Sequence, residues 1–244
     1  MRVLSASQLL HVWERGLSQT PMYQALLLLA VACPDLPIDA LEKLSVGRRD
    51  ALLLTLREWL FGPSLAGVTD CPGCGQRLEF TFSVVQIRAA LESEVVETLS
   101  LSVADYELEF RLPNSQDLIA AGKHQDPASA RHVILERCLL AAKRNGVETS
   151  AAQLPTDVVD TMAEKMARAD PQADVSFALS CRGCRHQWQA GFDIVSFFWS
   201  EIHAWAQRIL REVHTLASAY GWREADILQM SPSRRQFYLE LFGA

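Results

Sequence analysis

Apolar residues along the chain recur first at helical intervals. From about Ser5 to Phe61 they follow a period of about 3.6, with breaks at Pro34 and Pro37. Ser45 precedes the last apolar run of this part and is expected to cap a helix there. The pattern predicts an N-terminal helical segment over residues 1–65.

The residues beyond this segment alternate between apolar and polar side chains in several places, which is typical of β-strands. The alternating stretches are residues 77–82, 106–112, 175–179 and 187–190. Two of them directly follow a Cys-x-x-Cys pair, and one runs directly into the second pair. The pattern predicts a small sheet whose parts lie far apart in the sequence.

Helical spacing returns between and after these strands. We expect helices from Asp117, over Pro127–Lys143 with an end at Asn145-Gly146, and over Thr156–Ala169. The clearest helical pattern runs from Phe198 to Tyr220 and predicts a helix of about seven turns. Two short helices, forming a hairpin, should follow it.

Four of the six cysteines form two Cys-x-x-Cys pairs, Cys71 with Cys74 and Cys181 with Cys184. Each pair has a Gly before its second Cys, and such a turn can supply two corners of a tetrahedral Zn²⁺ site. More than a hundred residues separate the pairs, whereas a compact zinc ribbon has about 15–20. We therefore predict one structural Zn²⁺ site that joins the two halves of a split zinc ribbon around an insertion.

The sequence supports other roles for these cysteines less well. Disulfides or a redox-active pair would need an oxidising compartment or a βαβ context, and the sequence shows neither. A catalytic zinc ion keeps an open position and uses His or carboxylate ligands, whereas four thiolates leave no vacancy. His186 could replace one ligand, but it fits a solvated strand residue better. Cys33 and Cys138 lie on apolar helix faces and are expected in the core.

No Ser/His/Asp set, phosphate-binding Gly loop or His-Glu-x-x-His motif is present in the sequence. Asp117, Glu201, Asp226 and Glu240 are expected to be helix caps and solvated charges rather than catalytic acids. We therefore expect a protein without enzymatic activity and without a small-molecule substrate.

Charge and hydropathy argue against nucleic-acid-binding and membrane proteins. The chain has 23 basic and 29 acidic residues, a net charge of −6, which argues against binding nucleic acid. No apolar stretch approaches the ~20 residues that span a bilayer, and the N-terminus does not resemble a signal peptide. We expect a cytoplasmic protein, or one associated with an assembled particle, without membrane insertion.

Aromatic residues are concentrated in the C-terminal part of the chain. Their number exceeds what one face of a helix can bury in a small core. We predict that Phe198, Trp199, Trp205 and Trp222 contact a partner protein. The alternative is that the long helix is central in its own fold.

Several stretches resemble the T-even phage baseplate hub assembly chaperone family. They include residues 170–188 with the second cysteine pair, residues 192–202, Arg111-Leu-Pro-Asn-Ser-Gln-Asp, and the endings Tyr220-Gly-Trp and Ser231-Pro-Ser-Arg-Arg. The resemblance covers roughly residues 50–244 and fits the N-terminal helices least. It implies an assembly role in a contractile tail or injection system, with baseplate hub or tail proteins as partners and no catalytic residues.

The predicted fold is of the α+β class and mostly helical. It comprises an N-terminal helical segment (1–65), a split zinc-ribbon module (66–95 and 172–195), a strand and helical insertion (96–171) and C-terminal helices (196–244). The predicted function is that of a non-catalytic assembly factor or structural component of a baseplate. Two alternatives from other classes are a zinc-ribbon regulator that binds nucleic acid and a zinc hydrolase.

Overall fold

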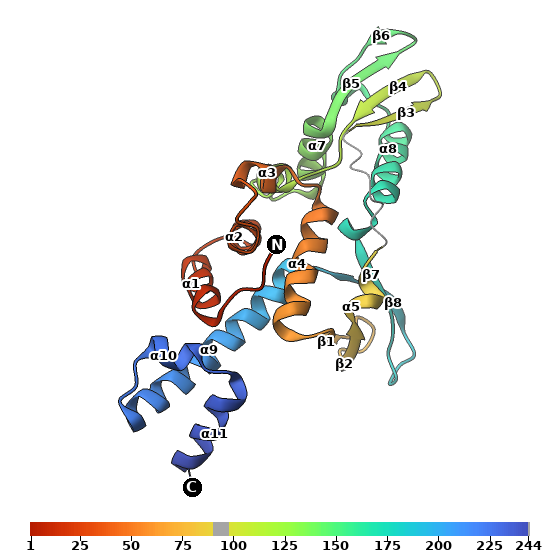
Figure 1. The fold of residues 1–244 in the computed structure, drawn as a ribbon. Coiled ribbons are helices and arrows are strands. Elements are labelled where there is room, and N and C mark those ends of the chain that lie inside the picture. Colours follow the sequence, from red (N-terminus) through yellow and green to blue (C-terminus); the bar gives the residue numbers. More distant parts are fainter. Residues whose placement is uncertain (90–97, 244) are drawn as a thin grey trace. The chain divides into compact units, whose positions relative to one another are not determined.

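The computed structural model describes residues 1–89 and 98–243 and confirms a mixed α+β fold (Figure 1). The chain forms two compact units, residues 1–35 with 194–244, and residues 36–193. The four segments inferred from the sequence stay a prediction, and the boundary at residues 95–96 lies outside the described residues.

The first unit is built from helices at both ends of the chain. They are α1 (Ala6–Gly16), α2 (Pro21–Ala32), α9 (Ile194–Tyr220), α10 (Glu224–Gln229) and α11 (Pro232–Gly243). Ser5 caps α1 in a capping box with Gln8, and Pro21 stands in the first turn of α2. The predicted long helix is α9, and the two predicted short helices after it are α10 and α11.

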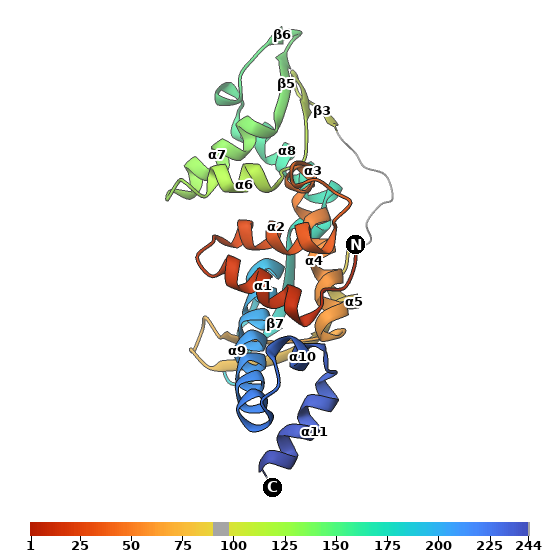
Figure 2. The ribbon, with the colours of Figure 1, turned by 60° about the vertical axis from the view of Figure 1, so that its left-hand side comes forward.

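The long helix α9 holds this unit together. It packs against α1, α2, α10 and α11, and Figure 2 shows α1 and α2 side by side, running across the upper end of α9. Leu10 of α1 lies with Ala206 and Ile209 of α9 in one apolar cluster, and a second cluster lies between α9, α10 and α11. The indole N–H of Trp13 also donates to Nδ1 of His203 at 3.1 Å, so a polar contact joins α1 to α9.

The second unit contains the remaining elements. Its helices are α3 (Ile38–Lys43), α4 (Val46–Phe61), α5 (Val84–Ile87), α6 (Ser115–Ala121), α7 (Pro127–Cys138), α8 (Thr156–Ala169) and the short 3₁₀ turns η1 (Ala151–Gln153) and η2 (Pro171–Ala173). Its strands are β1 (Ser64–Asp70), β2 (Arg77–Ser83), β3 (Leu99–Val103), β4 (Tyr106–Phe110), β5 (Leu139–Arg144), β6 (Val147–Glu148), β7 (Val175–Ser180) and β8 (Gln187–Phe192).

The start of α4 is tied to the end of α8. Ser45 caps α4 as predicted, since its hydroxyl accepts from the backbone N–H of Arg48 at 3.3 Å. The N–H of Gly47, in the same first turn, donates to the buried carboxylate of Asp170 at 2.8 Å. Because α4 leads into β1 and Asp170 leads through η2 into β7, this contact joins the two segments that carry the cysteine pairs.

Four antiparallel strands form a sheet in the order β3-β4-β5-β6. Alternate residues of β4, namely Tyr106, Leu108 and Phe110, are buried on one face. Cys138 and residues of α8 such as Met162 complete this apolar cluster, and Figure 1 shows α8 beside the sheet. The polar face is solvated, as expected for an antiparallel sheet.

The predicted helix over Pro127–Lys143 is wrong in its last five residues. The helix α7 ends at Cys138, and Leu139–Arg144 form β5, which pairs with β4. Asn145 and Gly146 have φ values of +50° and +80° and turn the chain into β6, so they close a hairpin and do not end a helix. An Asn-Gly pair is a strong hairpin signal, and it could have corrected the prediction.

Asp117 is a helix cap, as predicted, but it is not solvated. It forms a capping box with Asn114 at the start of α6, and its side chain is fully buried. Its carboxylate accepts from Arg111 Nη2 at 2.9 Å and from Arg137 Nε at 2.8 Å.

The predicted core positions of Cys33 and Cys138 are confirmed, since both are buried. Among the described helices, none is long and apolar enough to cross a bilayer.

Candidate metal centre

Two hairpins of the same design carry the cysteine pairs. In one, β1 and β2 are antiparallel and Asp70 pairs with Arg77 across the end of the ladder. In the other, β7 and β8 are antiparallel and Ser180 pairs with Gln187. Each hairpin therefore closes with a six-residue loop, residues 71–76 and residues 181–186. Strand β1 was not predicted, although the two ribbon halves were.

The hairpins pack on each other through phenylalanine rings. Phe82 of β2 lies 4.4 Å from Phe177 of β7 and 5.4 Å from Phe192 of β8, measured between ring centroids. Phe80 extends the cluster at 6.1 Å from Phe177. These separations are those of favourable aromatic pairs, and the cluster buries the apolar faces that each two-stranded hairpin would otherwise expose.

Both loops use the same backbone hydrogen bonds. The N–H of Cys71 donates to the carbonyl of Gln76, and the N–H of Cys181 donates to the carbonyl of His186, both at 2.9 Å. The residue after the second Cys is left-handed in each loop, with φ of +72° at Gly75 and +62° at Arg185. The two loops are thus equivalent turns that direct two thiols each toward a common point.

The four sulfur atoms converge. All lie within 4.8 Å of one another, with Sγ–Sγ distances of 3.6 Å between Cys71 and Cys184 and 3.7 Å between Cys74 and Cys181. A disulfide would need about 2.05 Å. Four sulfurs at about 2.3 Å from a tetrahedral Zn²⁺ ion would be about 3.8 Å apart. The donor set and its spacing therefore fit a four-coordinate metal ion.

The thiols influence each other's ionisation. The backbone N–H of Cys184, helped by that of Gly183, lowers the pKa of Cys181 to about 7. At Cys74 the backbone N–H of Gln76 lowers the pKa, but contacts with the neighbouring cysteines and loss of water outweigh it, and the pKa rises to about 12. One sulfur thus ionises readily and another resists, because the hydrogen bonds among the four cysteines favour the ionised form of Cys181 and the protonated form of Cys74. A divalent cation at their centre would favour the ionised form of all four thiols.

Burial differs within the cluster. Cys71 and Cys181 are buried, whereas Cys74 and Cys184 are exposed. His186 is exposed and is not part of the cluster, so the four cysteines would hold the ion without it. An ion in this site would have a closed thiolate shell and would link the hairpins without offering a position to a substrate.

The four aromatic residues predicted to contact a partner all lie in the first unit. Phe198 is fully buried, and the ring of Trp199 covers Gly16 of α1 so closely that a Cβ there would lie 2.2 Å from it. Trp205 and Trp222 are half-buried against the two apolar clusters of α9. These contacts support the alternative that α9 is central in its own unit, and only Trp199, Trp205 and Trp222 retain exposed surface.

The fold and site define an α+β protein in which a four-cysteine cluster joins two hairpins from distant parts of the chain. A family model described as T4 bacteriophage base plate protein matches residues 7–199, and the chain belongs to this family. Neither the curated proteins nor the solved structures contain a match to the chain. The family match extends over the N-terminal helices, where the resemblance noted from the sequence was least clear.

Proposed function

We propose that the protein is a non-catalytic assembly factor of a contractile-tail baseplate, which binds hub or tail proteins while the particle is built. The observation that supports this most directly is the match of residues 7–199 to the base plate protein family. An assembly chaperone is favoured over an enzyme, because the one cluster of metal-ligating side chains among the described residues is a closed four-thiol set.

The proposed metal is a structural Zn²⁺ ion held by Cys71, Cys74, Cys181 and Cys184. Zinc at such a site can contribute about 10 kcal/mol of folding free energy, which is large compared with the packing of two small hairpins. The ion would thereby fix the two ends of the long segment that separates the cysteine pairs.

Elemental analysis of anaerobically purified protein tests the metal site. We expect about one zinc per chain, and its loss when Cys71 and Cys181 are both replaced by Ser. The matched control is Cys33→Ala, which changes a buried cysteine of the other unit and should leave the zinc content unchanged. Protein that is folded and free of metal would contradict the proposal.

The proposed partner surface is the exposed apolar part of the C-terminal helices. Phe237, Leu241 and Phe242 of α11 are 59%, 55% and 59% exposed, which is unusual for three large apolar side chains on one short helix. They are also better test positions than Trp205 or Trp222, whose replacement would disturb the apolar clusters of the unit.

The assembly role is tested in cells that express the native gene cluster. Tagged protein is recovered from the lysate and from purified particles, and bound proteins are identified by mass spectrometry. Hub or tail proteins bound in the lysate, with none of the tagged protein in particles, would support a chaperone. Retention in the particle would make it a structural component, and normal particles after deletion of its gene would refute an assembly role.

A further inference from the structure

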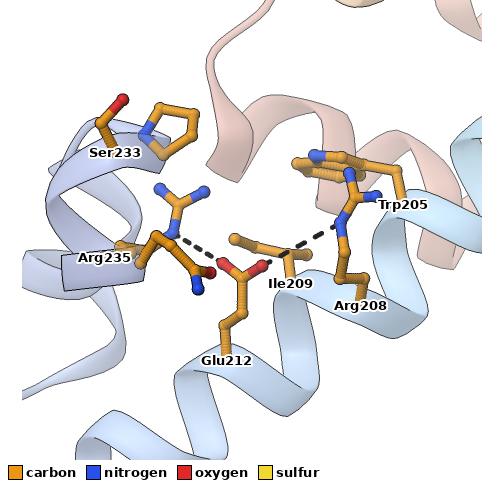
Figure 3. A pocket seen from close by; sticks show the side chains of 8 residues that line it. Trp205, Arg208, Ile209, Glu212, Ser233 and Arg235 are labelled. Atoms are coloured by element: carbon orange, nitrogen blue, oxygen red, sulfur yellow. Dashed lines mark hydrogen bonds and ion pairs between the residues drawn. The ribbon is translucent and has the colours of Figure 1, made fainter. Parts of the chain in front are cut away.

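A cavity of about 410 Å³ lies between α9 and α11 of the first unit (Figure 3). We call it the Trp205 pocket. Its lining combines apolar and charged side chains, namely Trp205, Arg208, Ile209, Glu212, Pro232, Ser233, Arg235 and Gln236. This size is within the range of cavities that receive a small ligand or a partner's side chain.

The two arginines of the pocket are paired to different degrees with its one carboxylate. Glu212 accepts from Arg235 Nε at 2.9 Å, and Arg235 is buried, with a second bond from Nη1 to the carbonyl of Met230 at 2.6 Å. Arg208 also approaches Glu212, but at 3.9 Å and with 68% of its side chain exposed. Figure 3 shows the carboxylate between the two guanidinium groups. Among the residues that line the pocket, two arginines against one carboxylate leave one positive charge, on the exposed Arg208.

The apolar part of the pocket lies beside this charge. Ile209 is buried, whereas the indole of Trp205 is half-exposed and the ring of Pro232 is exposed. Trp205 and Arg208 both line the pocket, and Figure 3 labels both side chains on α9. An apolar side chain could therefore cover Trp205 and Pro232 while a carboxylate attached nearby reaches Arg208.

We propose that the Trp205 pocket binds an acidic and apolar segment of a partner protein, with an aromatic or aliphatic side chain in the cavity and its neighbouring carboxylate on Arg208. The proposal rests on the proposed assembly function and adds the chemistry of the segment that is recognised. Its basis is charge complementarity. A neutral apolar partner would leave Arg208 without a new ion pair, and a basic partner would be repelled by it.

The first test uses 3-phenylpropionate as the probe and 3-phenylpropionamide as its uncharged analogue, with the full chain observed by NMR. The indole N–H signal of Trp205 is assigned with Trp205→Phe. We expect the carboxylate to shift this signal with millimolar affinity, about threefold more tightly than the amide, and the difference to shrink at high salt. The indole signal of Trp13, which donates to His203 in the same unit and does not line the pocket, should not move.

Variants of exposed arginines on α9 isolate the charge. Arg208→Gln should abolish the preference for the carboxylate, and Arg208→Lys should retain most of it. The matched control is Arg211→Gln, since Arg211 is exposed on the same helix but does not line the pocket. No shift at Trp205 with either compound, or equal loss of preference in Arg208→Gln and Arg211→Gln, would overturn the proposal.

The same Arg208→Gln and Arg211→Gln variants are then tested in the native gene cluster. A lower particle yield for Arg208→Gln alone would connect the pocket to assembly. Normal yield for Arg208→Gln, in cells where gene deletion does abolish particles, would refute the pocket proposal and leave the assembly function intact. If gene deletion has no effect, the proposed function itself fails, whatever the probe binding shows.

Discussion

Replacement of Gly47 by Ala should destabilise the second unit, although Ala is the better helix former. A Cβ at position 47 would lie 2.0 Å from Oδ1 of Asp170 and 2.9 Å from the backbone nitrogen of Ala173. Both separations are too short for real contacts, so the first turn of α4 and the turn η2 must move apart. The 2.8 Å hydrogen bond from the Gly47 N–H to Asp170 would then be lost.

The expected magnitude follows from three contributions. Loss of a buried hydrogen bond to a charged group costs about 1.5–3 kcal/mol, and forcing a methyl group into a packed site costs about 1–3 kcal/mol. The helix propensity of Ala returns about 1 kcal/mol. The net loss in free energy of unfolding is therefore roughly 1.5–5 kcal/mol, which urea denaturation followed by circular dichroism can resolve.

A double-mutant cycle with Asp170→Ala tests the cause. Removing the carboxylate makes room for the new methyl group, so Gly47→Ala should cost at least about 1 kcal/mol less in that background. The control is Gly191→Ala, where no atom lies within 4 Å of the added Cβ, and we expect a change within about 0.5 kcal/mol. Additive effects of Gly47→Ala and Asp170→Ala would refute the contact as the source of the loss.

Two further predictions concern buried charge and backbone strain. Burial raises the pKa of Asp117, but hydrogen bonds from Arg111, the Asn114 N–H and Arg137 outweigh it, and the net pKa is lowered. Its ionised form therefore contributes stability above the unfolded pKa of about 3.9, and this is lost as pH falls through the lower folded value. Asp117→Asn should thus lower the free energy of unfolding by about 3 kcal/mol at neutral pH and by progressively less below pH ~4. Urea titrations at several pH values measure this loss, and a loss that does not change with pH would contradict the prediction. Arg185→Gly should raise the free energy of unfolding by up to about 1 kcal/mol, because Arg185 is left-handed with φ of +62°, whereas Arg185→Ala should give no gain; equal values for the two variants would refute strain at this position.

Local sequence signals predicted the elements with short-range causes. The Cys-x-x-Cys pairs indicated two equivalent turns, and the structure brings their four sulfurs within 4.8 Å of one another. Ser45 was identified as a helix cap, and the helix over Thr156–Ala169 has the predicted bounds. These features depend on residues a few positions apart, so the sequence alone contains what determines them.

The boundary between α7 and β5 shows where local pattern was insufficient. Leu139–Arg144 are compatible with a helix, and they form a strand because β4 supplies hydrogen-bond partners and an apolar face. Asp117 was expected to be solvated, because the local pattern does not show which distant residues pack around it. Its buried carboxylate is paired with Arg137, which is 20 residues away and is brought to it by the packing of α7 on α6.

The sequence by itself therefore determined the class of the fold, the four candidate ligands and the caps and turns that position them. The tertiary structure decided which face of each aromatic residue is buried and which segments share a unit, such as the helices of residues 1–35 with those of residues 194–244. It also placed Arg208, Glu212 and Arg235 around one cavity. The physical reason is that burial and charge pairing depend on residues far apart in the chain, and their identity is set only when the helices and hairpins pack.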